Sequence, residues 1–181
     1  MPKDLSTHGS DILKEKIFNG DLPAYELLFK QNYPVLKKYA TKLIRNPEAA
    51  EEIASDVLIS VWKKRHELPQ ITFFRAYLYR SVRNACLNFL RTEKRSLDEG
   101  LSDDIADLST PETLLLNSEL NLRIQKAVLG LPPKCKACFS LVKEEGLSYK
   151  EAAQILGISP KTVDAQLIIA MRKIIDVLRT A

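Results

Sequence analysis

The apolar residues of this chain recur at helical spacing, and short polar or Gly- and Pro-containing segments separate the periodic stretches. Few runs alternate between β-branched and polar residues, so the pattern favours an all-α fold. Up to residue 96 it predicts helices over residues 11–18, 24–45, 47–64 and 73–91. Beyond residue 110 it predicts helices over residues 111–129 and 133–144, and two more between residues 148 and 178.

The last two predicted helices are joined by a tight turn. Ser148 can cap the first of them, and Glu151 three residues later completes a capping box. Gly157 can adopt the left-handed conformation that ends a helix. Ser159 can cap the second helix, with Pro160 at its first position. Such a pair is typical of a helix-turn-helix, whose second helix can enter the major groove of double-stranded DNA.

Charge is distributed in three blocks, although the net charge of the chain is only +4. Residues 1–96 hold 17 Lys and Arg against 11 Asp and Glu, and residues 120–181 hold 10 against 5. Between them, residues 97–119 hold seven acids and no base, together with Gly, Ser and Pro and no steady apolar period. The pattern predicts two small helical domains joined by an acidic linker. The basic flanks suit a polyanionic partner such as DNA.

The predicted helix over residues 73–91 has two contrasting faces. Its apolar stripe consists of Leu78, Val82, Ala85 and Phe89. Its polar side, which meets no acid before Glu93, carries Arg80, Arg83, Asn84, Asn88 and Arg91. A merely soluble face usually mixes both signs of charge, so this one indicates contact with phosphates.

Four aromatic residues gather at the start of the same helix, namely Phe73, Phe74, Tyr77 and Tyr79. Packing in the core would explain them. So would stacking on unpaired bases, because basic residues interleaved with aromatic rings suit single-stranded nucleic acid. The sequence leaves both interpretations open.

The predicted helix over residues 47–64, with Asn46 as its cap, also shows two faces. Ile53, Val57 and Val61 form an inward stripe. The outer face carries Glu52, Asp56, Ile59 and Lys63. An exposed isoleucine beside carboxylates is typical of a surface that binds another protein.

In this order the segments resemble the extracytoplasmic-function sigma factors, the small two-domain class of bacterial transcription initiation factor. The resemblance is carried by the opening helix at residues 24–34, the polymerase-clamp-binding helix at 46–62, the promoter-melting helix at 74–84 and the segment 131–139 before the helix-turn-helix. It implies an N-terminal tail and first helix at 1–20, a region-two-like domain at 21–95, the acidic linker at 96–112 and a region-four-like domain at 113–181.

The resemblance also implies roles for single residues. Glu52, Asp56, Ile59 and Lys63 would face the clamp of core RNA polymerase. The loop at residues 66–72, including Gln70 and Thr72, would hold a base flipped out of the minus-ten element, and the helix beside it would track the melted strand through Arg80, Arg83, Asn84, Asn88 and Arg91. The linker would thread the active-site cleft. The C-terminal domain would rest on the polymerase flap and read the minus-thirty-five element through Ser159, Pro160, Lys161, Thr162, Asp164, Ala165 and Gln166.

The resemblance further implies promoter DNA and an anti-sigma factor as partners, a monomer when free, and neither cofactor nor metal. No signal-peptide core or membrane-spanning run occurs in the sequence, so we expect a cytoplasmic protein without direct membrane insertion.

Two isoleucines leave alternatives open. Ile168 and Ile169 either touch DNA or are buried with the apolar stripe of the last helix, which comprises Val163, Leu167, Ala170, Met171, Ile174 and Leu178.

Two rival interpretations remain. A conventional helix-turn-helix regulator would act on duplex DNA without being a polymerase subunit, but it leaves the first 90 residues unexplained. An enzyme would rest on the pair Cys135 and Cys138, whose spacing occurs in redox and metal sites. The pair lies within a predicted helix, and no second such pair or nearby His exists, so we expect structural cysteines, no catalytic residue and no enzyme.

Overall fold

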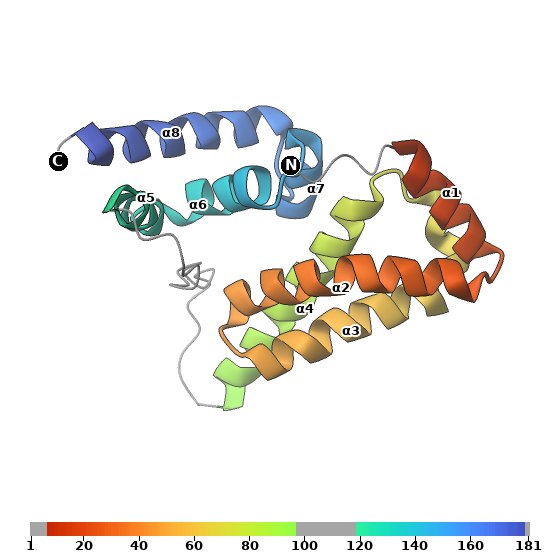
Figure 1. The fold of residues 1–181 in the computed structure, drawn as a ribbon. Helices are drawn as coiled ribbons and strands as arrows, with labels where there is room; N and C mark the ends of the chain where they lie inside the picture. The colour runs from red at the N-terminus through yellow and green to blue at the C-terminus, as the bar shows by residue number, and fades with distance from the viewer. Residues whose placement is uncertain (1–6, 97–118, 180–181) are drawn as a thin grey trace. The chain divides into compact units, whose positions relative to one another are not determined.

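The computed structural model describes residues 7–96 and 119–179, which form two compact units, with the chain divided between Gly100 and Leu101. All regular elements in these described ranges are helical, in agreement with the predicted all-α fold (Figure 1). The first unit contains α1 (Thr7–Phe18), α2 (Leu22–Ile44), α3 (Pro47–Lys63), the 3-10 helix η1 (Arg65–Gln70) and α4 (Phe74–Ser96). The second contains α5 (Glu119–Leu129), α6 (Pro133–Phe139), the π-helical η2 (Ser140–Glu144), α7 (Tyr149–Leu156) and α8 (Pro160–Arg179).

Two predicted segments lie largely or partly outside the described residues. They are the acidic linker, of which only Ser96 is described, and the first part of the helix expected over residues 111–129. One segment has a different secondary structure from the one expected. The segment expected as a loop at residues 66–72 is a 3-10 helix as far as Gln70. The helix expected over residues 133–144 consists of α6 as far as Phe139 and the π-helical η2 over the last five residues.

Side-chain caps set the helix starts of the first unit. The Asp21 carboxylate accepts a hydrogen bond from the Ala24 amide at 3.0 Å, so α2 begins two residues before the predicted start. The predicted cap Asn46 is confirmed, since its side chain accepts from the Ala49 amide at 3.1 Å. Arg45 takes the left-handed conformation (φ 55°) between the two helices. The chain therefore reverses sharply and lays α3 back along α2.

The core of the first unit lies where α2, α3 and α4 pack against one another (Figure 1). It contains Leu28, Leu36 and Ala40 from α2, Ala50, Ala54 and Leu58 from α3, and Leu78 and Val82 from α4. The small alanines allow the helix backbones to approach closely. Tyr39 and Tyr79 join α2 to α4 with ring centroids 4.9 Å apart. Three amphipathic helices are thus locked with their polar sides outward.

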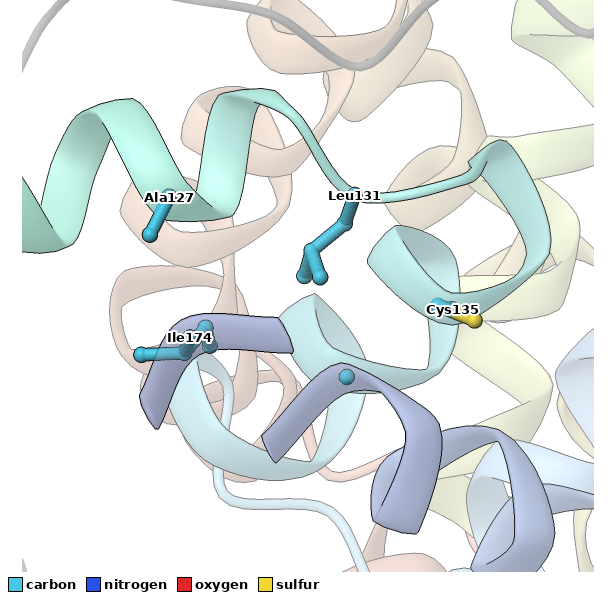
Figure 2. Packing of buried hydrophobic residues seen from close by; sticks show 5 residues of the cluster. Ala127, Leu131, Cys135 and Ile174 are labelled. Atoms are coloured by element: carbon cyan, nitrogen blue, oxygen red, sulfur yellow. The ribbon is translucent and has the colours of Figure 1, made fainter. Parts of the chain in front are cut away.

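The second unit is built around α8. Ala127 from α5, Leu131, and Cys135 from α6 pack with Ala170 and Ile174 of α8. Figure 2 shows Ala127, Leu131, Cys135 and Ile174 of this cluster. None of the helices in the described ranges is both long and apolar enough to cross a lipid bilayer.

The prediction that Met171 belongs to the buried stripe of α8 is wrong. Met171 is exposed, whereas Val163, Leu167, Ala170 and Ile174 are buried. Met171 follows Ala170 and therefore points about 100° away around the helix, at the edge of the packed side.

The adjacent residues Leu27 and Leu28 test the packing of the first unit. Leu28 is completely buried, whereas Leu27 is 49% exposed. We expect Leu28→Ala to lower the free energy of unfolding by about 2–5 kcal/mol, because the cavity cannot collapse fully. Leu27→Ala is the matched control and should change it by about 0.5 kcal/mol or less. Trp62 is the only tryptophan and lies in the first unit, so its fluorescence during urea unfolding reports on that unit. Equal effects of the two substitutions would contradict the assigned packing.

Candidate DNA-binding and protein-binding surfaces

The helix-turn-helix forms through the predicted caps. Ser148 and Glu151 make the reciprocal hydrogen bonds of a capping box, and Gly157 ends α7 in the left-handed conformation (φ 68°). The Ser159 hydroxyl accepts from the Thr162 amide at 3.0 Å and lies 2.8 Å from the Thr162 hydroxyl oxygen. These bonds fix the direction in which α8 leaves the turn, which a helix that enters a DNA groove requires.

The first two turns of α8 present most of the predicted recognition residues to solvent. Val163 and Leu167 are buried and attach the helix to its unit. On the outer side lie the exposed residues Ser159, Pro160, Lys161, Thr162, Asp164 and Ala165. Ile168 and Ile169 are 47% and 40% exposed, so the alternative that they are buried is wrong.

Gln166 differs from its neighbours because it is half-buried and engaged within the protein. Its Oε1 accepts a hydrogen bond from the Cys135 thiol, with 3.0 Å between sulfur and oxygen. The Gln166 carbonyl oxygen has two lone pairs, so Oε1 can accept from an adenine edge while it also accepts from Cys135. Nε2 can likewise donate to a base acceptor while the bond from Cys135 is kept. The contact between α6 and α8 therefore restricts the orientation of this amide group.

The polar face predicted on the fourth helix is present on α4. Arg80, Asn84, Asn88 and Arg91 are exposed, and Arg83 is half-buried. Opposite them Leu78 and Val82 are buried, while Ala85 and Phe89 are half-buried. No Asp or Glu occurs from residue 75 to residue 91. The face therefore carries a positive charge that suits a phosphate backbone.

The aromatic residues at the start of α4 divide between the two interpretations. Phe74 and Tyr79 are buried, and Tyr79 packs on Tyr39, so both belong to the core. Phe73 and Tyr77 are only half-buried. Stacking on a base therefore remains available to Phe73 and Tyr77 alone.

The segment between α3 and α4 carries Gln70 and Thr72 on its surface, where both side chains are exposed. Leu68 is buried and anchors η1 to the unit. The Ile71 amide donates to the Leu68 carbonyl at 3.1 Å, and the Ile71 carbonyl accepts from the Lys14 ammonium at 3.0 Å. Sequence reasoning missed Lys14, because a contact across 57 residues leaves no local signal.

The outer face of α3 carries the four predicted protein-binding residues Glu52, Asp56, Ile59 and Lys63, all of which are exposed. On the inner side Val57 and Val61 are buried, and Ile53 is half-buried. Non-covalent contacts with α2 hold α3 near both of its ends. Lys37 pairs with Glu51, whose carboxylate raises the pKa of that lysine. Tyr25 donates to the Leu58 carbonyl at 3.1 Å and packs on Trp62. The four side chains thus project from a fixed support.

The three cysteines are free and buried. Burial raises the pKa of Cys86 to about 12, and burial and then the neighbouring Cys135 raise that of Cys138 to about 11. Within residues 7–96 and 119–179, no group of three or more His, Cys, Asp or Glu side chains is placed to hold a metal ion. The Cys135 thiol also donates a hydrogen bond to Gln166.

Thiol titration tests this placement. At pH 7–8 Cys86 and Cys138 should react with an aromatic disulfide reagent far more slowly than in denaturant, because raised pKa values and burial leave little accessible thiolate. Unfolding should expose all three thiols, and the absorbance of the released thiolate measures each stage. Rapid stoichiometric reaction of all three in the folded protein would contradict the buried positions. Cys86→Ser and Cys138→Ser, made separately, assign the slow phases.

Comparison with known proteins identifies both units. The Sigma-70 region 2 family model matches residues 28–96, and the Sigma-70, region 4 family model matches residues 121–174. The ECF RNA polymerase sigma factor SigE of Mycolicibacterium smegmatis is 29% identical over 150 residues, 81% of this chain and 58% of that protein. The chain thus spans little more than half of that relative.

Another relative matches over more of its length. The ECF RNA polymerase sigma-E factor of Escherichia coli is 23% identical over 176 residues, 91% of each chain. Among solved structures, the sigma factor RpoE, in complex with the anti-sigma factor NepR from Bartonella quintana, has a similar fold. It gives a TM-score of 0.62 at 20% identity and covers 86% of this chain and 96% of that chain.

Proposed function

Because this chain belongs to the ECF family of RNA polymerase sigma factors, we propose that it binds core RNA polymerase and directs promoter recognition and DNA melting at transcription initiation. The observation that carries the proposal is the correspondence between units and family regions. The region 2 match falls within the first compact unit and the region 4 match within the second. A regulator that acts without polymerase would leave the region 2 match unexplained.

The first unit would have two tasks on separate helices. The outer face of α3 would dock on the polymerase clamp through Glu52, Asp56, Ile59 and Lys63, a mixed surface that suits a protein partner. The basic face of α4 and the segment with Gln70 and Thr72 would bind the minus-ten element. A base that leaves the stack costs a few kcal/mol, which protein contacts must offset.

The second unit would place the start of α8 in the major groove of the minus-thirty-five element and rest on the polymerase flap. Lys161 would contact phosphate, and Thr162, Asp164, Ala165 and Gln166 would meet base edges. Exposed Ile168 suits contact with a thymine methyl group. In this division of labour the chain supplies binding free energy in the cytoplasm, while nucleotide chemistry belongs to the polymerase.

We further propose that an anti-sigma factor holds the chain inactive. Support comes from the similar fold of Bartonella quintana RpoE, which was solved with NepR. From the resemblance to the family we also propose a domain division at residues 21–95, 96–112 and 113–181. The acidic linker would pass through the polymerase active-site cleft. When free of both partners the chain would be a monomer.

Core-polymerase binding is tested through α3. The double variant Asp56→Ala/Ile59→Ala should weaken binding to core polymerase about tenfold or more, because central interface residues contribute most of the affinity. Both residues are exposed, so the fold should persist. Fluorescence anisotropy of the labelled chain measures the affinity, and circular dichroism checks the fold. The matched control Lys161→Ala/Gln166→Ala lies in the other unit and should bind core normally. Unchanged affinity of the α3 variant would remove this face from the proposal.

Upstream recognition is tested through α8. The variant Lys161→Ala/Gln166→Ala should lose about 1–3 kcal/mol of duplex recognition for each base contact removed, while Lys161 also affects salt dependence. Run-off transcription from a duplex promoter should therefore fall. Transcription from a template already open across the minus-ten element should be far less affected. Equal losses on both templates would place these residues outside upstream recognition.

A further inference from the structure

Helix α1 precedes the region 2 match, which begins at residue 28, and the proposed function gives it no task. It nevertheless packs on η1 and contributes a buried charge. Lys14 is only 8% exposed, and its ammonium donates to the Ile71 carbonyl at 3.0 Å. Removing an ammonium group from water is costly unless hydrogen bonds compensate. The bond to Ile71 helps to compensate for this cost, and it joins α1 to the segment that follows η1.

A second contact links α1 to the other end of the same segment. Phe18 packs against His66 edge to face, with ring centroids 5.6 Å apart. Lys14 and Phe18 are four residues apart and so share one face of α1. Ile17, which is completely buried, fastens that helix to the unit. Helix α1 thus holds the segment 65–72 near its beginning, at His66, and near its end, at Ile71.

Ile71 is held through both of its peptide groups. Its amide donates to the Leu68 carbonyl, and its carbonyl accepts from Lys14. The residues on either side, Gln70 and Thr72, direct exposed side chains to solvent. Fixing the backbone between two polar side chains limits the conformations that both can adopt. A preorganised site loses less conformational entropy when it binds a ligand.

We propose that Lys14 is a positioning residue, which holds residues 65–72 in the conformation that captures an unstacked promoter base. This inference rests on the proposed function. It makes α1 part of the melting machinery, and it assigns Lys14 an indirect action through Ile71, Gln70 and Thr72. Base capture matters most on duplex DNA, where the protein must compensate for lost stacking. Once the strands are already separated, this contribution to opening is no longer required.

The test compares run-off transcription by the full chain with core polymerase on two templates, a duplex promoter and the same promoter mismatched across the minus-ten element. Lys14→Met removes the charge and the donor but keeps an unbranched side chain. The ratio of duplex to mismatched yield should fall by about tenfold, the scale of a lost hydrogen bond to a charged group. An unfolded fraction of the variant lowers both yields by the same factor and leaves this ratio unchanged.

Two further variants make the result specific. Lys14→Arg keeps a cationic donor and should restore the ratio toward that of the wild type. The control Lys16→Met changes an exposed lysine on the same helix and should leave the ratio unchanged. If Lys14→Met yields too little folded protein, Lys14→Gln replaces it; its amide is uncharged and one bond shorter, so the ratio should again fall.

The outcomes separate the two proposals. A wild-type ratio for Lys14→Met, or for Lys14→Gln in its place, overturns the positioning role. If the wild-type chain itself neither binds core polymerase nor starts transcription, the proposed function fails instead.

Discussion

Burial of one apolar side of each helix is the constraint on which the rest of this structure depends. In the first unit Leu58 and Val61 of α3 and Leu78 and Val82 of α4 are withdrawn from water. A helix that buries these positions must turn the opposite side outward. Rotating α4 to bury its arginine face would place several guanidinium groups in an apolar core at a large free-energy cost. The packing therefore decides which side chains can meet a partner.

The same constraint joins the two activities proposed for the first unit. Helices α3 and α4 pack on α2 and on each other, so the proposed protein-binding face and the proposed DNA-binding face have a common core. Their connection runs through η1, anchored by Leu68 and supported from α1 by Lys14 and Phe18. Docking on polymerase would thus present the basic face of α4 on a preformed support.

In the second unit, polar contacts set the direction of α8 and the orientation of one of its side chains. Recognition requires α8 to leave its turn in a fixed direction, and the caps at Ser148 and Ser159 provide this direction. Recognition also requires a defined orientation for each side chain near a base. The bond from the buried Cys135 thiol on α6 supplies an orientation for the Gln166 amide on α8. One contact thus packs α6 against α8 and orients a proposed recognition residue.

The sequence by itself determined the helical class, most helix limits and the division into exposed and buried faces. These properties depend on local rules: caps such as Asn46 and Ser159, the left-handed Gly157, and an apolar period that repeats within a single helix. The exposed positions of Asp56, Ile59 and Arg80 could therefore be predicted. Resemblance to a family, rather than any local rule, supplied their roles.

Only the tertiary structure decided the contacts between distant segments. The burial of Tyr79, the exposure of Met171 and Ile168, and the bonds from Lys14 to Ile71 and from Cys135 to Gln166 all depend on which helices become neighbours. Helical periodicity states which residues share a face, but it does not state how wide the covered stripe is or which atoms cover it. Those quantities follow from the packing of several helices at once, and no single stretch of sequence contains them.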